Sequence, residues 1–598
     1  MQNFKEKADL IWRVADLLRG DYKQSDYGKI ILPMTVLRRL DSVLSPTKQQ
    51  VLKRLASVEY MDAAARDMVL NKTAGLNFHN HSLYDFDKLI ADAANLALNL
   101  RNFINGFSEN AREIIEYFEF DKQIDKLDDP KSDLLFQVVK AFQEIDLTGM
   151  TSMEMGYVFE DLIRRFAEQS NETAGEHFTP REVIRLMVNL LFAEDREMLT
   201  QKGIVKTIYD PACGTGGMLS VAEQYLKELN PESSLVLFGQ EINPESYAIC
   251  KSDMLIKGQE VNNIKFGNTF TVDGLQSERF NYMLSNPPFG VDWKKAEKVI
   301  KKEASDMGFS GRFGAGLPRI NDGSLLFLQH MISKMNPDGS RIGIVFNGSP
   351  LFTGAAGSGE SEIRRWIIEN DWLEAIVAMP DQLFYNTGIS TYIWILTNKK
   401  SKERKGKIQL INATGVKDEE LMEDGKLDFN RFWDKMSRSL GNKRKKIAEN
   451  GNEKGIGFIT ELYGNFEENE FVKILPNDYF GYWRVTVEQP LIENGKAVKS
   501  KGKPKPDTSL RDYENIPFLE EDSNGKLIPQ TIKDYFEREV KPHLPEAWID
   551  ESKTKIGYEI NFTKYFYEFK PLRSLMDIKA DILRLEEKTA DSVHKILD

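Results

Sequence analysis

Cysteine is almost absent from this chain, which has only Cys213 and Cys250 among its 598 residues. Two thiols build neither a disulfide framework nor a four-cysteine zinc site, and a reducing cytoplasm is the expected setting. The six histidines show no ligand spacing, so no metal site is predicted. A run of about 18 apolar residues, the length that spans a membrane, is also missing. The first residues lack an apolar signal-peptide core, so we expect neither membrane association nor export.

Basic residues are also fewer than acidic residues. The chain has 92 acidic and 80 basic residues and a formal net charge of -12. This balance excludes a surface coated with positive charge for non-specific nucleic-acid binding, although it leaves room for a local basic cleft. The remaining composition, 41% hydrophobic and 29% charged, is typical of a folded protein. The length predicts about three or four structural units.

The spacing of apolar residues divides the chain into four segments. Residues 1–148 show helical spacing and are predicted to form an all-helical domain. In residues 149–415, short apolar runs alternate with amphipathic helices, which predicts an α/β core with a largely parallel sheet covered by helices on both faces. Residues 416–545 are expected to be a mixed region with a basic linker. Residues 546–598 end in an amphipathic helix whose apolar stripe needs a partner surface, on this chain or on another subunit.

The predicted strands of the core are short apolar runs bounded by turn residues. They are residues 207–209, 235–239, 282–285, 341–346, 373–378 and 391–397. Sheets of this kind bind ligands at the carboxyl ends of their strands, and the informative motifs fall at these ends.

The first motif is a glycine-rich turn at residues 209–219, directly after a predicted strand and before a predicted helix. Its glycines permit a tight turn and the close approach of a ligand. Leu219 stands where the dinucleotide fingerprint has its third glycine, which disfavours NAD. The Asp-Pro opening and the double glycine fit S-adenosylmethionine better. The residues of this turn expected to bind the cofactor are Asp210, Pro211, Gly214, Thr215, Gly216 and Gly217.

Two polar residues are expected at the edge of the same cleft. Glu241 ends the second predicted strand, where a carboxylate can accept hydrogen bonds from both ribose hydroxyls of a nucleotide. Asn268 follows further along the chain, and its amide oxygen can accept from an adenine amino group.

The most specific motif, at the end of another strand, consists of Asn286, Pro287, Pro288 and Phe289. Two prolines fix the backbone and remove two amide donors, which leaves the Asn286 side-chain oxygen and the Pro287 carbonyl as adjacent acceptors. Two acceptors can hold both hydrogens of an adenine amine and favour its nucleophilic, pyramidal form. Phe289 can stack on the base. Because the base must leave the duplex to reach these groups, the motif implies base flipping.

These motifs resemble those of amino-methyltransferases that modify adenine N6 in DNA. Over the whole chain, the sequence resembles the methylation subunit of type I restriction-modification systems, with residues 17–20 and 36–41 similar to that family's helical N-terminal domain. Residues 175–181 resemble its leading cofactor motif. By this resemblance Phe178, Thr179 and Pro180 cover the methionine and adenine parts of S-adenosylmethionine. The other cofactor residues of the motif are Glu176 and His177, where the family usually has Gln and Tyr, and Arg181.

The order of the motifs resembles the gamma class, because the cofactor motif precedes the glycine turn and the Asn-Pro-Pro-Phe motif comes last. Residues 439–444, 480–487 and 558–598 resemble the ends of type I methylation subunits. The resemblance implies an S-adenosylmethionine-dependent methyltransferase core. It also implies a separate DNA specificity subunit, a restriction subunit, double-stranded DNA and a second copy of the chain as partners.

Three other functions stay open at this point. The chain can be a self-sufficient methyltransferase whose residues after about 400 read DNA. It can also be a catalytically silent assembly subunit that retains the fold. Finally, the substrate can be RNA or a protein glutamine, because each presents an amine or amide that the acceptors of the same Asn-Pro-Pro motif can hold.

Overall fold

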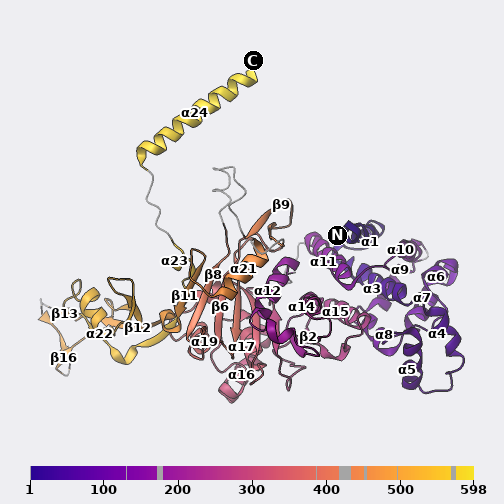
Figure 1. Cartoon of the computed structure of the whole chain (residues 1–598), viewed down its shortest axis with the longest axis horizontal. Coiled ribbons are helices and arrows are strands. Elements are labelled where there is room, and N and C mark those ends of the chain that lie inside the picture. Colours follow the sequence, from indigo (N-terminus) through magenta and orange to yellow (C-terminus); the bar gives the residue numbers. More distant parts are fainter. Residues whose placement is uncertain are drawn as a thin grey trace. The chain divides into compact units, whose positions relative to one another are not determined.

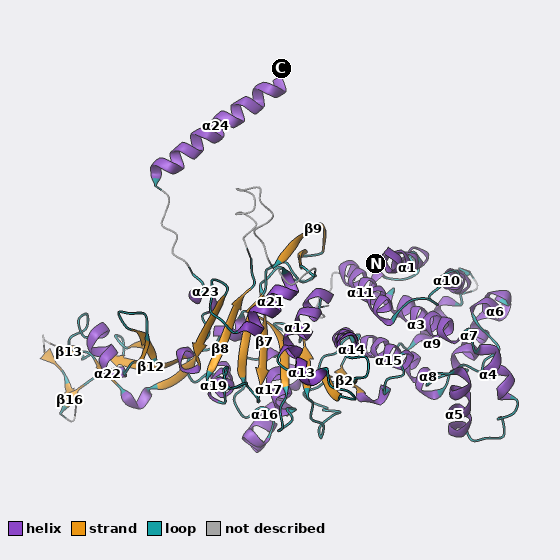
Figure 2. Cartoon of the chain, viewed as in Figure 1, coloured by secondary structure: helices purple, strands orange, loops and turns teal. Residues whose placement is uncertain are grey.

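The computed structural model describes residues 2–129, 131–170, 179–385, 387–415, 432–449, 454–493, 496–500, 502–567 and 574–597. The chain divides into a compact unit that ends at Ile560 and a second unit from Asn561 to Asp598. Figure 1 traces the chain and Figure 2 separates its helices from its strands.

The N-terminal segment is helical, as predicted. Its helices are α1 (Gln2–Trp12), α2 (Val14–Leu17), α3 (Gly28–Leu44), α4 (Lys48–Leu55), α5 (Ala63–Ala74), α6 (Phe86–Ala91), α7 (Leu96–Asn105), α8 (Glu109–Glu116), α9 (Phe120–Leu127) and α10 (Leu134–Gln143). Helix α3 is buried along most of its length. Its Arg39 guanidinium donates to the carbonyls of Leu147 and Met150, both at 2.6 Å, so α3 holds the connection to the core.

The core is built on a nine-stranded sheet with the order β11-β8-β6-β7-β5-β4-β1-β2-β3. Its strands are β1 (Val205–Asp210), β2 (Ser234–Glu241), β3 (Ile264–Phe266), β4 (Tyr282–Ser285), β5 (Arg341–Asn347), β6 (Leu373–Ala378), β7 (Thr391–Thr397), β8 (Lys407–Asn412) and β11 (Val472–Pro476). The six predicted strands are all present, and β3, β8 and β11 are additional. Strands β3, β2, β1, β4 and β5 run parallel, whereas β7 pairs antiparallel with both β5 and β6.

The helices of this core pack on the sheet or on one another. They are α11 (Ser152–Ser170), α12 (Arg181–Ala193), α13 (Arg196–Leu199), α14 (Gly217–Leu229), α15 (Pro244–Ile256), α16 (Glu297–Met307), α17 (Ser324–Ser333), α18 (Ser349–Phe352), α19 (Gly359–Glu369) and α21 (Gly455–Asn465). Every residue of β6 is buried, so side chains on both faces of this strand are covered, as the near-continuous apolar runs predict. None of the described helices is both long and apolar enough to span a membrane.

The remaining strands form small sheets beyond residue 430. They are β9 (Trp433–Leu440), β10 (Lys443–Ile447), β12 (Gly481–Glu488), β13 (Ile492–Glu493), β14 (Lys496–Ala497), β15 (Lys499–Ser500), β16 (Lys503–Pro504), β17 (Asp512–Pro517), β18 (Leu519–Glu521), β19 (Leu527–Pro529), β20 (Trp548–Ile549) and β21 (Lys555–Tyr558), with the short helix α22 (Ile532–Tyr535). The basic segment expected as a linker carries the exposed strand pair β15–β16. The second unit contains α23 (Phe562–Tyr565) and the long helix α24 (Leu575–Leu597), in agreement with the predicted C-terminal helix.

Candidate functional site

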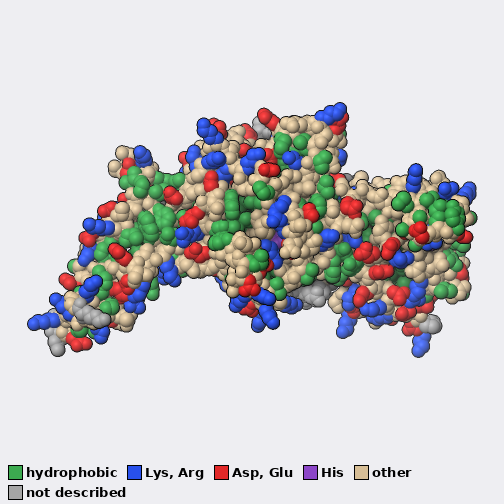
Figure 3. Space-filling model, turned by 90° about the horizontal axis from the view of Figure 1, so that it is seen from below, with side chains coloured by type: hydrophobic (Ala, Val, Ile, Leu, Met, Phe, Trp, Pro, Cys, Tyr) green, Lys and Arg blue, Asp and Glu red, His purple; other side chains and the backbone are tan. Residues whose placement is uncertain are grey.

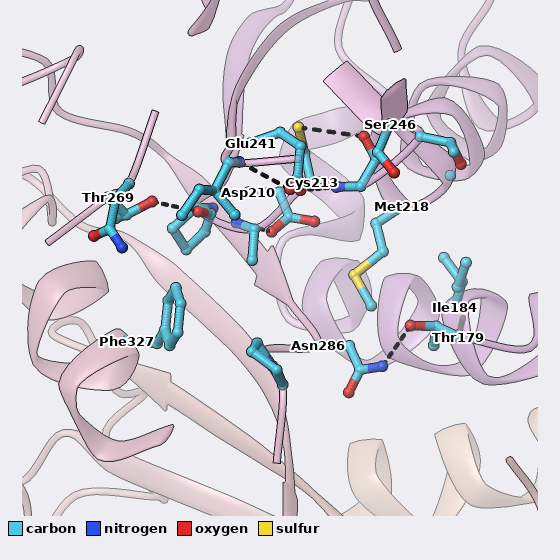
Figure 4. Close-up of a pocket in the computed structure, with 18 of the residues that line it drawn as sticks. Thr179, Ile184, Asp210, Cys213, Met218, Glu241, Ser246, Thr269, Asn286 and Phe327 are labelled. Carbon is cyan, nitrogen blue, oxygen red and sulfur yellow. Dashed lines mark hydrogen bonds between the residues drawn. The ribbon is translucent and has the colours of Figure 1, made fainter. Parts of the chain in front are cut away.

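A cavity of about 240 Å³ opens at the carboxyl ends of β1, β2 and β4 (Figure 4). This edge of the sheet is where the sequence motifs were expected to meet. The lining residues are Glu160, Thr179, Arg181, Ile184, Asp210, Pro211, Ala212, Cys213, Gly214, Thr215, Gly217, Met218, Glu241, Ile242, Ser246, Gly267, Asn268, Thr269, Phe270, Asn286, Pro288 and Phe327.

The glycine turn between β1 and α14 forms one wall of this cavity. Gly214 and Gly216 have φ angles of 52° and 82°, in the left-handed region that side chains rarely adopt. A Cβ atom on Gly216 would lie 2.8 Å from the Sγ of Cys250 on α15. Glycine is therefore required at position 216 both by its backbone conformation and by the lack of space behind the turn.

Glu241, at the end of β2, holds this turn in place. Its Oε2 accepts a hydrogen bond from the Gly214 amide at 2.7 Å, and its Oε1 accepts from the amides of Ile242 and Asn243 at 2.8 and 2.7 Å. Burial raises the pKa of the carboxyl group, and these amide hydrogen bonds counteract part of that shift. A carboxylate offers about four acceptor positions, so one position on Oε2 is left to face a ligand.

Asp210, at the end of β1, is buried beneath the turn. Its Oδ1 accepts from the Ala212 amide and from the Ser285 hydroxyl, both at 3.0 Å. Burial raises the pKa of this carboxyl to about 7, although both hydrogen bonds act in the opposite direction.

The raised pKa of Asp210 predicts a pH-dependent stability. Between about pH 4, the value for an unfolded aspartate, and pH 7, the folded state retains a proton that the unfolded state has lost. The folded state therefore loses stability as the pH rises through this window. Asp210→Asn keeps the accepting oxygen but removes the charge. We expect the melting temperature of the wild type to fall more steeply than that of Asp210→Asn between pH 5 and 7, measured by calorimetry without ligand. Parallel pH profiles would contradict the assignment.

Asn286 follows β4 and projects into the cavity opposite the glycine turn. Its Nδ2 donates to the Oγ1 of Thr179 at 2.8 Å, and Figure 4 shows the side-chain oxygen facing away from that bond. Thr179 lies just before α12, so the start of this helix orients the amide. Phe289 is half-buried and meets the ring of Phe384 edge-on, with centroids 6.4 Å apart.

Asn268 lines the cavity, but its oxygen is already engaged. The Oδ1 accepts from the amides of Phe270 and Thr271 at 2.9 and 3.2 Å. The group that this side chain offers to a ligand is therefore the Nδ2 donor, and not the oxygen on which the sequence-based expectation rests.

Arg181 is buried at the first turn of α12. Its guanidinium is 3.4 Å from Glu160 on α11, lies over the ring of Tyr157 and approaches the Gly217 carbonyl at 3.5 Å. Burial raises the pKa of Glu160. The cavity thus contains one guanidinium and the carboxyl groups of Glu160, Asp210 and Glu241.

The structure brings most of the predicted site residues together. Those that line the cavity are Thr179, Arg181, Asp210, Pro211, Gly214, Thr215, Gly217, Glu241, Asn268, Asn286 and Pro288. Pro180, Gly216, Pro287 and Phe289 stand beside these residues without lining it. Glu176, His177 and Phe178 lie outside the described residues. Within the described part of the chain, no group of three or more His, Cys, Asp or Glu side chains is arranged to hold a metal ion.

Sequence reasoning missed several lining residues that come from helices. Glu160 on α11, Ile184 on α12 and Phe327 on α17 reach the cavity through tertiary packing. Each lies in an amphipathic or apolar helix and looks like an ordinary helix residue. Ser246, in the first turn of α15, and Phe270 follow the predicted Glu241 and Asn268 within a few positions, so their nearness in sequence to those residues is the local signal that points to them.

The largely parallel sheet, with a glycine turn after β1 and Glu241 at the end of β2, has the arrangement that α/β methyltransferases share with other nucleotide-binding proteins. A family model described as N-6 DNA methylase matches residues 151–449, half of the chain, and one described as the HsdM N-terminal domain matches residues 8–142. The chain belongs to the N-6 DNA methylase family and is a methylation subunit of the type I restriction-modification kind.

Individual relatives agree. The type I restriction enzyme MjaIX methylase subunit of Methanocaldococcus jannaschii is 26% identical over 428 residues, which cover 68% of this chain and 72% of the relative. The MjaVII methylase subunit of the same organism is 30% identical over 320 residues, about half of each chain. A type I methyltransferase subunit from Streptococcus thermophilus has the same fold, with a TM-score of 0.60 and 23% identity over 80% of this chain and 97% of that one.

Proposed function

We propose that this chain transfers the methyl group of S-adenosylmethionine to the N6 amine of an adenine flipped out of double-stranded DNA, as a modification subunit whose sequence specificity comes from a separate subunit. The observation that carries the proposal is that Asn286 and the glycine turn line the same cavity. Methyl donor and adenine amine can then meet within one enclosed site.

The charges of the cavity suit this cofactor. S-adenosylmethionine carries a sulfonium and an ammonium group, which the carboxyl groups of the cavity attract. It also carries a carboxylate, which suits the guanidinium of Arg181 beside Glu160. The remaining acceptor position of Glu241 suits a ribose hydroxyl. The Nδ2 of Asn268 suits a ring nitrogen of the cofactor's adenine.

The chain's part in the reaction is to position the amine. We assign the Asn286 oxygen and the Pro287 carbonyl to the two hydrogens of the adenine amine, with Phe289 against the base. The amine proton becomes acidic only as the nitrogen gains positive charge, so no strongly shifted general base is required. Orientation and electrostatic complementarity are then the main catalytic contributions.

Assembly with partners explains the acidic chain. A protein with a net charge of -12 is poorly suited to hold DNA alone, because phosphate neutralisation supplies much of that affinity. Helix α24 presents Leu575, Met576, Ile578, Ile582 and Leu583, each at least 40% exposed. We assign this stripe to subunit assembly. A specificity subunit, a second copy of the chain and a restriction subunit are the proposed partners, and the cytoplasm is the proposed location.

The test is transfer of tritium from labelled S-adenosylmethionine to DNA, RNA and protein, assayed side by side with the chain alone and with its cognate specificity subunit. We expect labelled DNA, with the label on adenine N6, only in the assembled complex. Methylation of a defined site by the chain alone would favour the self-sufficient enzyme. Label in RNA or protein would favour those substrates, and calorimetry without S-adenosylmethionine binding would favour a silent assembly subunit.

A further inference from the structure

Helix α16 follows the Asn-Pro-Pro-Phe motif and has two unlike faces. Its inner face packs against the cavity wall, since Ala296 and Ile300 belong to one buried apolar cluster with Trp293 and with Phe270, which lines the cavity. Its outer face, with the turn before it, carries five lysines, all exposed: Lys294, Lys295, Lys298, Lys301 and Lys302.

A charged clamp fixes α16 to this wall. Arg312 donates to both carboxylate oxygens of Glu303, at 3.0 and 2.7 Å, and also to the carbonyls of Thr269 and Phe270, both at 2.8 Å. The indole of Trp293 donates to the Arg319 carbonyl at 2.9 Å. Since Thr269 and Phe270 line the cavity, the lysine face is held at a defined place beside the site.

Most of these lysines form no ion pair with the residues that the structure describes. Lys301 pairs with Glu297 at 2.6 Å, whereas no ion pair among the described residues involves Lys294, Lys295, Lys298 or Lys302. Glu303 is turned inward to Arg312. Asp292 and Asp306 stand at the two ends of the segment. The outer face is therefore a local concentration of positive charge on an acidic chain.

The lysine face lies close in the chain to the residues assigned to the reaction. The chain leaves the carboxyl end of β4, passes through Asn286 and Phe289 and enters α16 a few residues later, so the helix begins at the cavity edge of the sheet. Figure 3 shows the chain from below, with Lys and Arg side chains exposed along the lower edge of that view. A duplex that delivers a base to Asn286 must pass close to this edge.

We propose that the outer face of α16 binds the phosphate backbone of DNA next to the adenine that enters the cavity. The inference rests on the proposed function and names the surface that holds its substrate. Exposed ammonium groups act as mobile point charges, so they suit phosphates without reading sequence. The face thus supplies a local basic surface on a chain whose overall charge is negative.

The test compares two sets of substitutions in the full chain assembled with its cognate specificity subunit. The first set is Lys294→Gln, Lys295→Gln, Lys298→Gln and Lys302→Gln. The matched control is Lys399→Gln, Lys402→Gln, Lys405→Gln and Lys407→Gln, which removes three exposed lysines between β7 and β8 and one at the start of β8, at the opposite edge of the sheet. Duplex binding is measured by fluorescence anisotropy over a salt series, and methyl transfer is measured separately.

We expect the α16 variant to bind the duplex about tenfold more weakly at 0.1 M salt and to lose about two to four units from the slope of log affinity against log salt, because each phosphate contact contributes about 0.9. S-adenosylmethionine binding and the control variant should match the wild type. An unchanged slope in the α16 variant, or an equal loss in the control, would overturn the inference. A wild-type complex that binds DNA without methylating it would contradict only the proposed function.

Discussion

Replacing Asn286 by alanine is expected to lower kcat for methyl transfer by about 100 to 1,000-fold, the range seen when one group that stabilises a transition state is removed. The substitution deletes the side-chain oxygen assigned to the adenine amine and leaves the glycine turn and Glu241 untouched. Because the Asn286 amide also bonds to Thr179, the loss includes the orientation that this bond supplies. Affinity for S-adenosylmethionine should stay close to that of the wild type.

Single-turnover methylation with saturating DNA separates the chemical step from binding, and calorimetry reports the cofactor affinity. Asn262→Ala is the matched control, because Asn262 is an exposed asparagine before β3, at the other end of that strand from the cavity. The control should methylate at the wild-type rate. If Asn286→Ala binds the cofactor normally and also methylates at that rate, the positioning role is wrong.

Gly216→Val is expected to abolish measurable S-adenosylmethionine binding, a loss of at least about 100-fold. A branched side chain at a φ of 82° is strained by about 1–3 kcal/mol, and its Cβ meets the Cys250 sulfur at 2.8 Å. The turn can relieve the backbone strain and the close contact with Cys250 only by moving. Such movement displaces the Gly214 amide from Glu241 and closes the space in which the cofactor is proposed to lie.

Calorimetric titration measures this loss, and a thermal melt shows whether the variant folds. Gly203→Val is the control, since Gly203 also has a positive φ, 72°, but has open space around it and precedes β1, away from the cavity. A valine at position 203 therefore has the backbone strain of a positive φ but no close contact with a neighbouring side chain. Equal cofactor affinity in Gly216→Val and the wild type would show that the turn does not contact the cofactor.

The fold was largely accessible from the sequence because its central strands are continuous apolar runs between turn residues. The additional strands could not be predicted from the sequence, for identifiable reasons. Strand β3 has three residues, too few for a periodicity, and β8 and β11 lie in or next to charged sequence. Strand β11 joins the sheet only by pairing with β8, a contact between distant residues that no local pattern encodes.

The residues of the candidate site likewise fall into those that could be predicted from the sequence and those that could not. Residues that follow a strand directly, such as Asp210, Glu241 and Asn286, could be found because the carboxyl ends of parallel strands converge. Glu160 and Phe327 could not, since each reaches the cavity from a helix through tertiary packing. Residue type also did not settle the role of Asn268, because the atom it presents depends on which backbone amides its oxygen has already engaged.

The contact between Gly216 and Cys250 has a consequence for how this protein changes over generations. The two positions lie on different elements yet fill one small volume behind the turn. The room for a side chain at position 216 therefore depends on which residue stands at position 250. Substitutions at these two positions are therefore not independent, because a change at position 250 alters what a side chain at position 216 would meet.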